Sequence, residues 1–269
     1  MTLKRKTVVQ QIINQSQLVD SRGYVADIRD NLIATVSLGD FQENFLAGNG
    51  NELNRKAKAV HSSSVLCANF FGFFKSSVNG FVVLGESNFL HQQFEKKLPT
   101  GLRGSPANLD FYLENDSCII GIESKFLEPL APKIPKFSPS YEDGFLDLIH
   151  YGLSDIVRHY KQNDIKSHLD TAQLIKHSIG LLKEKQKKKK EAKLIYLYWE
   201  PVNASEFSEY SLHKDELTGF SERIKGSVPD ISFHHFSYWE FCNLFANNIK
   251  FEQHLTNFKD RYLIKVHNL

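Results

Sequence analysis

Three charged residues in one short stretch have the types and spacing for metal-assisted chemistry. Asp110 and Glu123 lie in two runs of alternating apolar and polar residues, and Lys125 comes two residues after Glu123. Residues two apart in a strand point to the same side of a sheet, so Lys125 is predicted to lie beside Glu123. A four-residue loop between the runs pairs residue 114 with residue 119 and sets Asp110 directly opposite Glu123.

Two opposed carboxylates repel each other, so this pairing is costly unless a cation lies between them. Two carboxylates on rigid strands, with water in the remaining positions, suit Mg²⁺, and Mn²⁺ is the expected substitute. Lys125 can then orient or deprotonate an attacking water, or neutralise a phosphorane-like transition state. The alternative is a surface hairpin with a fortuitous Glu–Lys pair.

The apolar residues of the two runs are predicted to share one face of this hairpin and to pack a core, because each run alternates with a period of two. They are Leu109, Phe111 and Leu113 in the first run, and Ile120, Ile122 and Phe126 in the second. The opposite face is then left to Asp110, Glu123 and Lys125.

The spacing resembles the signature of the PD-(D/E)xK nucleases: Asp110, twelve intervening residues, then Glu123-Ser124-Lys125. The usual context of that signature is a β-hairpin, which the alternation predicts independently. The resemblance implies an α/β restriction-endonuclease-like fold, with an αβββαβ core and a central mixed sheet flanked by helices. It also implies metal-dependent hydrolysis of phosphodiester bonds. One departure is that the proline normally found just before the aspartate is here Pro106.

The resemblance also implies one more acidic metal ligand, supplied by a helix before the hairpin. Glu52 is the first candidate, because the run from Gly48 to Leu53 looks like a less characterised branch of these proteins. Glu95 is its rival. A glutamate in the first turn of a helix is also favoured by the helix dipole alone, so Glu52 has a purely structural alternative.

Three polar residues are candidates for contacts around this site. His61 can contact a phosphate or a water, and the alternative is a capping histidine. Gln173 lies on a predicted helix after the Glu-x-Lys strand, where the resemblance implies that a glutamine can reach the site; otherwise it faces solvent. Arg103, in the loop that leads into the hairpin, is a candidate phosphate contact or a solvated cation.

The elements that position these residues follow from apolar periodicity and capping residues. Strands are predicted at 81–84, 194–199 and 231–236, and 89–98 is predicted to continue the sheet or to form a short helix. The order strand, helix, strand after the hairpin predicts a parallel crossover. The predicted helices are 40–48, 62–74, 144–161, 167–182 with Ser167 as N-cap, 237–245 and 251–264.

Two stretches have unusual composition. Four of the eight prolines lie between Pro129 and Pro139, which predicts an irregular excursion after the Glu-x-Lys strand. That excursion is either a DNA-contacting loop or a spacer. The run from Lys183 to Lys193 is rich in lysine and is predicted to be a solvated turn, with phosphate contact as the alternative.

Length and composition limit the remaining choices. The 269 residues suit a single nuclease domain over 1–269, with its core at about 40–200 and elaborations at both ends. The net charge is only +2, so nucleic-acid binding requires a local basic patch. Three widely spaced cysteines favour a reducing compartment over a zinc site. No leader and no long apolar run are found, which predicts a cytoplasmic protein with no membrane segment.

These observations predict a Mg²⁺-dependent DNA endonuclease, expected to be a type II restriction enzyme. It is expected to act on double-stranded DNA as a homodimer, so that both strands are cut. No phosphate-binding loop motif is present, so ATP is not expected. The alternatives are a nicking or repair nuclease of the same fold, a non-catalytic nucleic-acid-binding protein, and an unrelated α/β protein with a chance motif.

Overall fold

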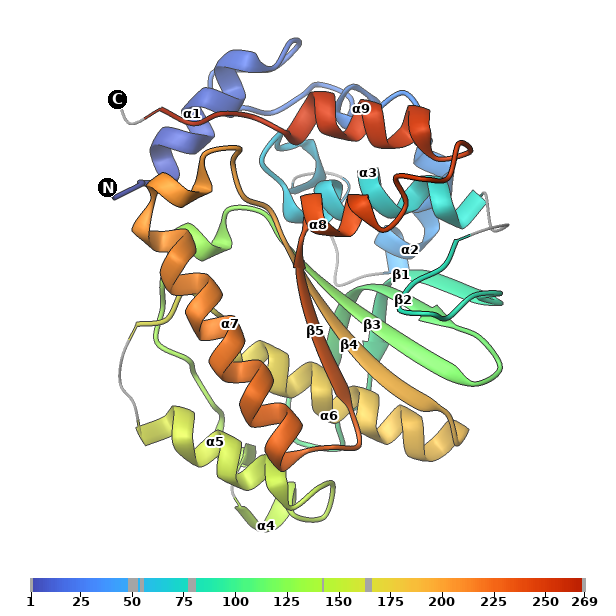
Figure 1. The fold of residues 1–269 in the computed structure, drawn as a ribbon, viewed down its shortest axis with the longest axis vertical. Helices are drawn as coiled ribbons and strands as arrows, with labels where there is room; N and C mark the ends of the chain where they lie inside the picture. Colours follow the sequence, from blue (N-terminus) through green and yellow to red (C-terminus); the bar gives the residue numbers. More distant parts are fainter. Residues whose placement is uncertain are drawn as a thin grey trace.

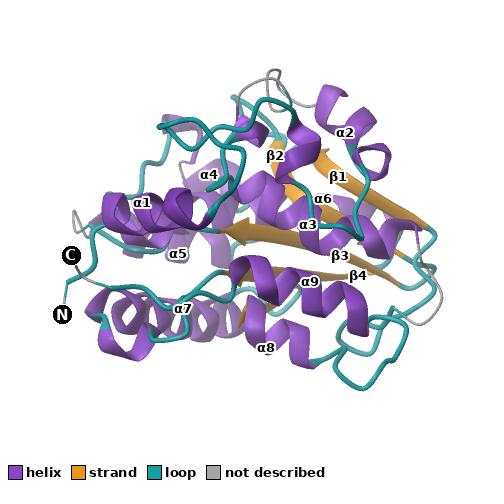
Figure 2. Cartoon of the chain, turned by 90° about the horizontal axis from the view of Figure 1, so that it is seen from above, coloured by secondary structure: helices purple, strands orange, loops and turns teal. Residues whose placement is uncertain are grey.

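The computed structural model describes residues 2–47, 53, 56–76, 81–141, 143–162 and 166–267. Within these residues it contains one five-stranded sheet in the order β1-β2-β3-β4-β5, with helices on both faces (Figures 1 and 2). The strands are β1 (His91–Leu98), β2 (Ala107–Glu114), β3 (Cys118–Lys125), β4 (Glu191–Tyr198) and β5 (Ser232–Ser237). The first three strands are antiparallel and the last three parallel, so the predicted mixed α/β sheet is confirmed.

Helices cover the two faces of the sheet in separate groups. The helices are α1 (Arg5–Gln15), α2 (Gln42–Ala47), α3 (Ser63–Ser76), α4 (Asp143–Leu146), α5 (Gly152–Gln162), α6 (Thr171–Lys188), α7 (Ser208–Ser227), α8 (Tyr238–Asn243) and α9 (Glu252–Tyr262). One core lies between the sheet and α1, α3, α8 and α9, and the other lies between the sheet and α5, α6 and α7. The arrangement is consistent with a restriction-endonuclease-like fold. No helix in the described part of the chain is long and apolar enough to cross a bilayer.

Aromatic rings fill the core on the α3 side. Phe70 contacts the rings of Phe74, Tyr238, Phe241 and Phe258, with centroids 5.1–5.6 Å apart. The phenylalanine-rich helix predicted at 62–74 is therefore a core element. Each buried aromatic side chain removes a large apolar area from water, which fixes this helix layer against the sheet.

The hairpin has the predicted register, with Glu114 paired to Ile119. Its turn is closed by Asn115, whose side-chain oxygen accepts hydrogen bonds from the backbone amides of Ser117 and Cys118 at 3.0 and 2.7 Å. From β3 the chain passes through α4, α5 and α6 and returns to β4, which lies parallel to β3. The predicted parallel pairing after an intervening helix is thus confirmed.

The prediction that Leu109 and Phe111 share one face is wrong. Leu109 packs in the core on the α6 side, whereas Phe111 packs in the core on the α3 side, stacked on Phe71 with ring centroids 4.5 Å apart. The neighbouring strand β1 slips in the same way at Glu95, whose φ of +52° breaks the regular pleat. Side chains before and after Glu95 and Asp110 therefore alternate between the two faces of the sheet in opposite order. Counting apolar residues along the sequence does not reveal this change.

Close approach of α6 to the sheet depends on Gly121 in β3. A Cβ atom at this position would lie 2.8 Å from Cδ1 of Leu109 and 2.9 Å from Cδ1 of Leu181. Real Cβ atoms do not approach other carbons that closely, so a larger residue at 121 requires the side chains of Leu109 and Leu181 to shift. Because Gly121 is two residues before Glu123, this packing sets the distance between α6 and the predicted site.

Several predicted elements differ from the structure. Residues 81–84 form no strand, and only an isolated bridge joins Val83 to Glu86. The helix predicted at 144–161 is divided into α4 and α5, because Leu148 and Tyr151 between them are exposed and supply no continuous apolar face. The helix α7, with twenty residues, is absent from the predicted elements.

Helix α6 begins and ends at other residues than predicted. Its N-cap is Asp170, whose side chain accepts a hydrogen bond from the amide of Gln173, and Ser167 lies three residues before the cap. The helix continues through Lys188, so the first half of the lysine run is helical and its prediction as a turn is wrong. The terminal lysines are held by acidic partners on the sheet and on the helix itself, which stabilises the extra turns.

One of these partners, Glu114 at the end of β2, gives a testable pH dependence. Its buried carboxylate accepts hydrogen bonds from Lys190 at 2.7 Å, from Lys188 at 2.5 Å and from the hydroxyl of Tyr112 at 2.9 Å. Burial acts to raise the pKa of Glu114, but these bonds outweigh it and lower the pKa from 4.5 to about 2. The unfolded chain therefore binds more protons than the folded chain between those two values.

We expect Glu114 to contribute about 3 kcal/mol of stability at neutral pH, because a lowered pKa stabilises the folded state above the unfolded pKa. This contribution is lost as the pH falls from about 4.5 towards 2. Glu114→Gln should be less stable at pH 7 and should lose less stability in acid than the wild type. Urea unfolding at several pH values measures both effects, and Glu222→Gln, an exposed glutamate on α7, is the control. Parallel acid curves for wild type and Glu114→Gln would contradict the assignment.

Candidate active site

Glu123 and Lys125 lie on the face of the sheet that α6 covers. The Glu123 side chain is 2% exposed and forms an ion pair with the amine of Lys125, which is 12% exposed. That amine also donates to Oε1 of Gln173 on α6 at 2.8 Å. One helical turn further, Nε2 of His177 lies 2.7 Å from Oε2 of Glu123. Residues four apart share one face of a helix, so α6 presents both Gln173 and His177 to β3.

Asp110 lies beside Glu123 and Lys125 because its side chain binds the backbone of β3. The last paired residues of β2 and β3 on this side are Phe111 and Ile122. Asp110 precedes Phe111 in β2 and so lies just beyond the paired part of the two strands. Its Oδ2 accepts a hydrogen bond of 2.7 Å from the amide of Ser124, which lies between Glu123 and Lys125. The structure therefore brings together the three residues that the sequence singled out, although Asp110 is anchored to the strand backbone.

The electrostatics of this group are unbalanced. Burial and the neighbouring Glu123 carboxylate raise the pKa of Asp110 well above its usual range, and Lys125 opposes this only in part. Burial also acts to raise the pKa of Glu123, but the charges of Lys125 and His177 outweigh it and lower the pKa to about 2. Two carboxylates thus share one lysine, and any further positive charge placed between them would favour the ionised form of both.

Glu95 faces Asp110 from the other side of β2. Phe94 pairs with Phe111 and Lys96 with Leu109, so Glu95 and Asp110 are the facing residues between these pairs. Glu95 is buried, its carboxylate accepts a hydrogen bond from Asn108, and its charge helps to raise the pKa of Asp110. A positive φ costs a non-glycine residue about 1–2 kcal/mol, so β1 stores strain next to the candidate site.

The donor set has the character that a hard divalent cation requires. Asp110 and Glu123 supply carboxylate oxygens, and Asp110 is half-buried whereas Glu123 is buried. Oε2 of Glu123 is buried without a well-directed hydrogen bond, because the nearby His177 lies off the hydrogen-bond direction. These residues fit a Mg²⁺ ion, although in the part of the chain described here no three His, Cys, Asp or Glu residues form a ready metal cluster.

The other predicted site residues have different outcomes. Glu52 lies outside the described residues. His61 packs edge-on against Tyr24 and, among described residues, makes no hydrogen bond to Asp110, Glu123 or Lys125. Burial lowers the pKa of His61, with a further contribution from Arg5. His61 is therefore a partly buried histidine that lies next to the core on the α3 side of the sheet.

Arg103 is exposed in the loop before β2 and lines a cleft together with Gln173. Arg103 thus lines the same cleft as Gln173, which accepts a hydrogen bond from Lys125. It makes no ion pair with any residue in the described ranges, so its guanidinium is available to a ligand.

His177 is the contact residue to which sequence reasoning gave no role. It is 1% exposed and touches the carboxylate of Glu123, as described above. The available signal was its position four residues after Gln173 on the same polar stripe of a helix. That stripe is buried here, because α6 lies against the sheet, and a buried polar stripe needs partners.

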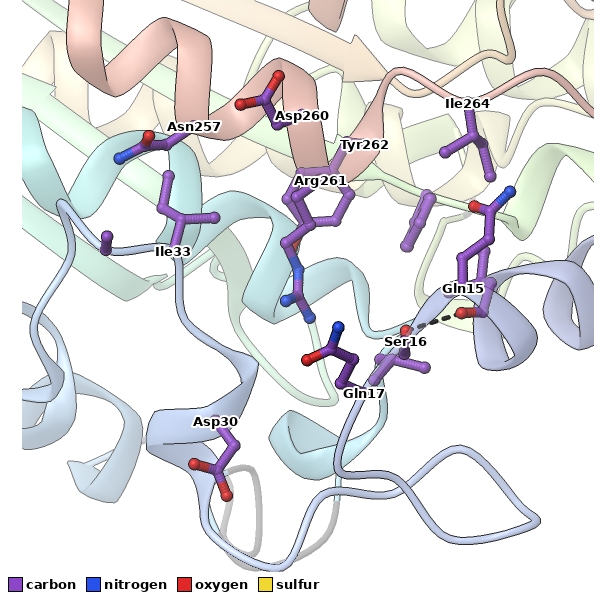
Figure 3. Close-up of a pocket in the computed structure, with 14 residues that line it drawn as sticks. Gln15, Ser16, Gln17, Asp30, Ile33, Asn257, Asp260, Arg261, Tyr262 and Ile264 are labelled. Carbon is purple, nitrogen blue, oxygen red and sulfur yellow. Dashed lines mark hydrogen bonds between the residues drawn. The ribbon is translucent and has the colours of Figure 1, made fainter.

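A separate cavity of about 430 Å³ lies between the N-terminal segment and α9 (Figure 3). Arg261 extends into it from α9 towards Gln17 and Asp30. Phe126, the residue after Lys125, is also part of its lining. None of the residues predicted to do chemistry lines this cavity, so the candidate active site is the Asp110–Glu123–Lys125 group.

Comparisons with known proteins give one match. A family model described as "Restriction Endonuclease associating with ARP" matches residues 13–263. No curated protein and no solved structure matches the chain. The match covers nearly all of the sequence, including every element of the sheet and the whole candidate site. The chain therefore belongs to this restriction endonuclease family.

Proposed function

We propose that this nuclease is a metal-dependent DNA endonuclease of the PD-(D/E)xK type. The observation that supports this most is that Asp110, Glu123 and Lys125 lie together. Asp110 binds the amide of Ser124, and the residues on either side of Ser124, Glu123 and Lys125, form an ion pair. A chance motif in an unrelated protein does not require these three side chains to meet. Family membership supports the same reaction class, hydrolysis of a nucleic-acid backbone.

Asp110 and Glu123 would hold a Mg²⁺ ion, which Mn²⁺ can replace. Such an ion polarises a phosphoryl oxygen and lowers the pKa of a bound water. His177 and Lys125 fix the orientation of the Glu123 carboxylate from either side. The Ser124 amide binds Oδ2 of Asp110 and so fixes the position of this carboxylate, which would supply a second ligand to the ion. Glu95 and Glu52 are candidates for a further carboxylate.

Lys125 is positioned to act on the attacking water or on the scissile phosphate. A lysine ammonium has three N–H donors. Glu123 and Gln173 accept two of them, which leaves the third for a water or a phosphate oxygen. This arrangement supports orientation of the water and neutralisation of the transition state, both of which use the charged amine.

The specific form proposed is a type II restriction enzyme that cuts double-stranded DNA as a homodimer. The family description also names an association with ARP. We extend that association to this chain on the strength of the description alone, and the cleavage assay is therefore run with and without ARP.

A plasmid digest tests the proposal directly. We expect cleavage with Mg²⁺ or Mn²⁺ and none with EDTA, because in the proposed mechanism the bound metal ion lowers the pKa of the attacking water. Discrete linear fragments support restriction, whereas open circles without linear products support a nicking enzyme. Intact plasmid in every metal, with and without ARP, would reject the nuclease mechanism for these residues.

His177→Leu is expected to lower the cleavage rate about 10- to 100-fold, the usual loss when a residue behind a metal ligand is removed. The reason is that Glu123 loses the contact that orients Oε2. The concentration of Mg²⁺ needed for half-maximal activity should rise as well, which a purely structural role does not predict. Ser178→Ala, at the next buried position of α6, is the matched control. Unchanged metal dependence in His177→Leu would remove His177 from the site.

A further inference from the structure

A basic cleft of about 980 Å³ opens beside the candidate active site. One wall is the loop before β2 and the other is the proline-rich segment after β3, while the start of α6 forms the floor. Gln173 belongs to this floor and also accepts the hydrogen bond from Lys125. Lys125 itself lines a small neighbouring pocket, which shares Lys133 and Asp170 with this cleft.

The charge of this cleft contrasts with that of the whole chain. Its lining contains five cationic side chains and one carboxylate: Arg103, Lys133, Lys136, Lys166, Lys176 and Asp170. The whole protein has a net charge of only +2. Positive charge is therefore concentrated where three separate segments meet, and a concave surface of one sign focuses the field on an anionic ligand.

The five cations divide into two groups by their contacts. Lys133 is paired with Asp170 at 2.6 Å, and Lys176 donates to Oγ of Ser105 at 2.7 Å. These two hold the walls of the cleft to α6. Arg103, Lys136 and Lys166 are exposed and form no ion pair with any residue that the structure describes. Three unpaired cations on different walls, at the mouth of an active site, are suited to successive phosphates of a polymer.

We propose that this cleft binds the phosphodiester backbone of the DNA strand to be cut, through Arg103, Lys136 and Lys166. This inference rests on the proposed function for its substrate. Phosphate contacts of this kind fix the position of the strand without reading its bases. The proline-rich segment thus serves as a wall of the binding site, and the two paired lysines hold that wall in place.

The test compares two triple variants that change the net charge equally. The first is Arg103→Gln/Lys136→Gln/Lys166→Gln. The second, as control, replaces three exposed lysines of the opposite layer, Lys4→Gln/Lys250→Gln/Lys265→Gln. Binding of a fluorescent DNA duplex is measured in EDTA over about 50–200 mM salt, the range in which counterion release dominates affinity. Circular dichroism and thermal unfolding check that both variants are folded.

Removing three phosphate contacts should make the negative slope of log K, the association constant, against log salt shallower by about 3. Binding at about 0.15 M salt should be about 100-fold weaker. The control should keep the wild-type slope. Equal slopes for the two variants would overturn the cleft assignment even if the wild type cuts DNA. A slope change confined to the first variant, in a protein that binds but never cuts, would keep the cleft and reject the nuclease mechanism. Absence of wild-type binding would reject the cleft, and the same slope change with an RNA duplex alone would reassign it to RNA.

Discussion

Lys125→Met should lower the rate of DNA cleavage about 10³-fold, the scale seen when a preorganised charged donor is removed from an active site. The amine of Lys125 lies between Glu123 and Gln173, and no other cation in the described chain contacts both. Loss of the amine removes the group proposed to orient the water and to offset charge on the phosphate. Plasmid cleavage under single-turnover conditions with saturating Mg²⁺ measures the loss.

This substitution also has a cost in stability, which must be separated from the chemistry. Lys125→Met leaves the buried carboxylate of Glu123 with only His177 beside it, and an unpaired buried charge costs about 3 kcal/mol. The double variant Glu123→Gln/Lys125→Met removes both charges and should unfold close to the wild-type temperature. We expect it to be folded and inactive. Cleavage by Lys125→Met within tenfold of the wild type would remove Lys125 from the mechanism.

Asp110→Asn is expected to change activity and stability in opposite directions. The amide oxygen of asparagine can still accept the hydrogen bond from Ser124, so the local geometry is kept. The substitution removes a carboxyl group whose ionisation is disfavoured by burial and by the charges of Glu123 and Glu95, and without metal it should stabilise the fold by about 1–2 kcal/mol. Cleavage should fall about 10³-fold, because the proposed metal ligand is lost.

Thermal unfolding with EDTA and with Mg²⁺ separates these two effects. The wild type should gain stability from Mg²⁺, since a ligand that binds only the folded state raises its stability, whereas Asp110→Asn should gain little. Asp116→Asn, at the exposed turn of the same hairpin, is the control and should behave as the wild type does. Lower stability of Asp110→Asn in EDTA would show that the carboxylate is not held under like-charge repulsion.

The sequence by itself determined the hairpin and its charged residues. Alternation of period two and a polar turn are local properties, so they predicted the register in which Glu114 pairs with Ile119. The same local rule placed Glu123 and Lys125 on one side of β3. The family resemblance added the order of helices and strands, and the family match supports the nuclease class.

Local patterns were insufficient where a contact depends on a partner from another segment. The phase change at Glu95 and Asp110 needs two neighbouring strands to slip together, and neither strand shows it alone. The extra turns of α6 depend on Glu114, a residue more than seventy positions earlier in the chain. Helix α7 has a mixed surface whose buried side is defined by packing against β5 and α5.

The tertiary structure alone decided which polar residues surround the site. Gln173 and His177 look like an ordinary polar stripe until α6 is packed on the sheet, where burial makes each of them need a partner. Asp110 joins the group because the pairing of β2 with β3 stops at Phe111 and Ile122. The Ser124 amide therefore binds the carboxylate of Asp110. The sequence identified the residue types that can do chemistry. Whether they meet depends on where the pairing of β2 with β3 stops and on how closely α6 packs against these strands.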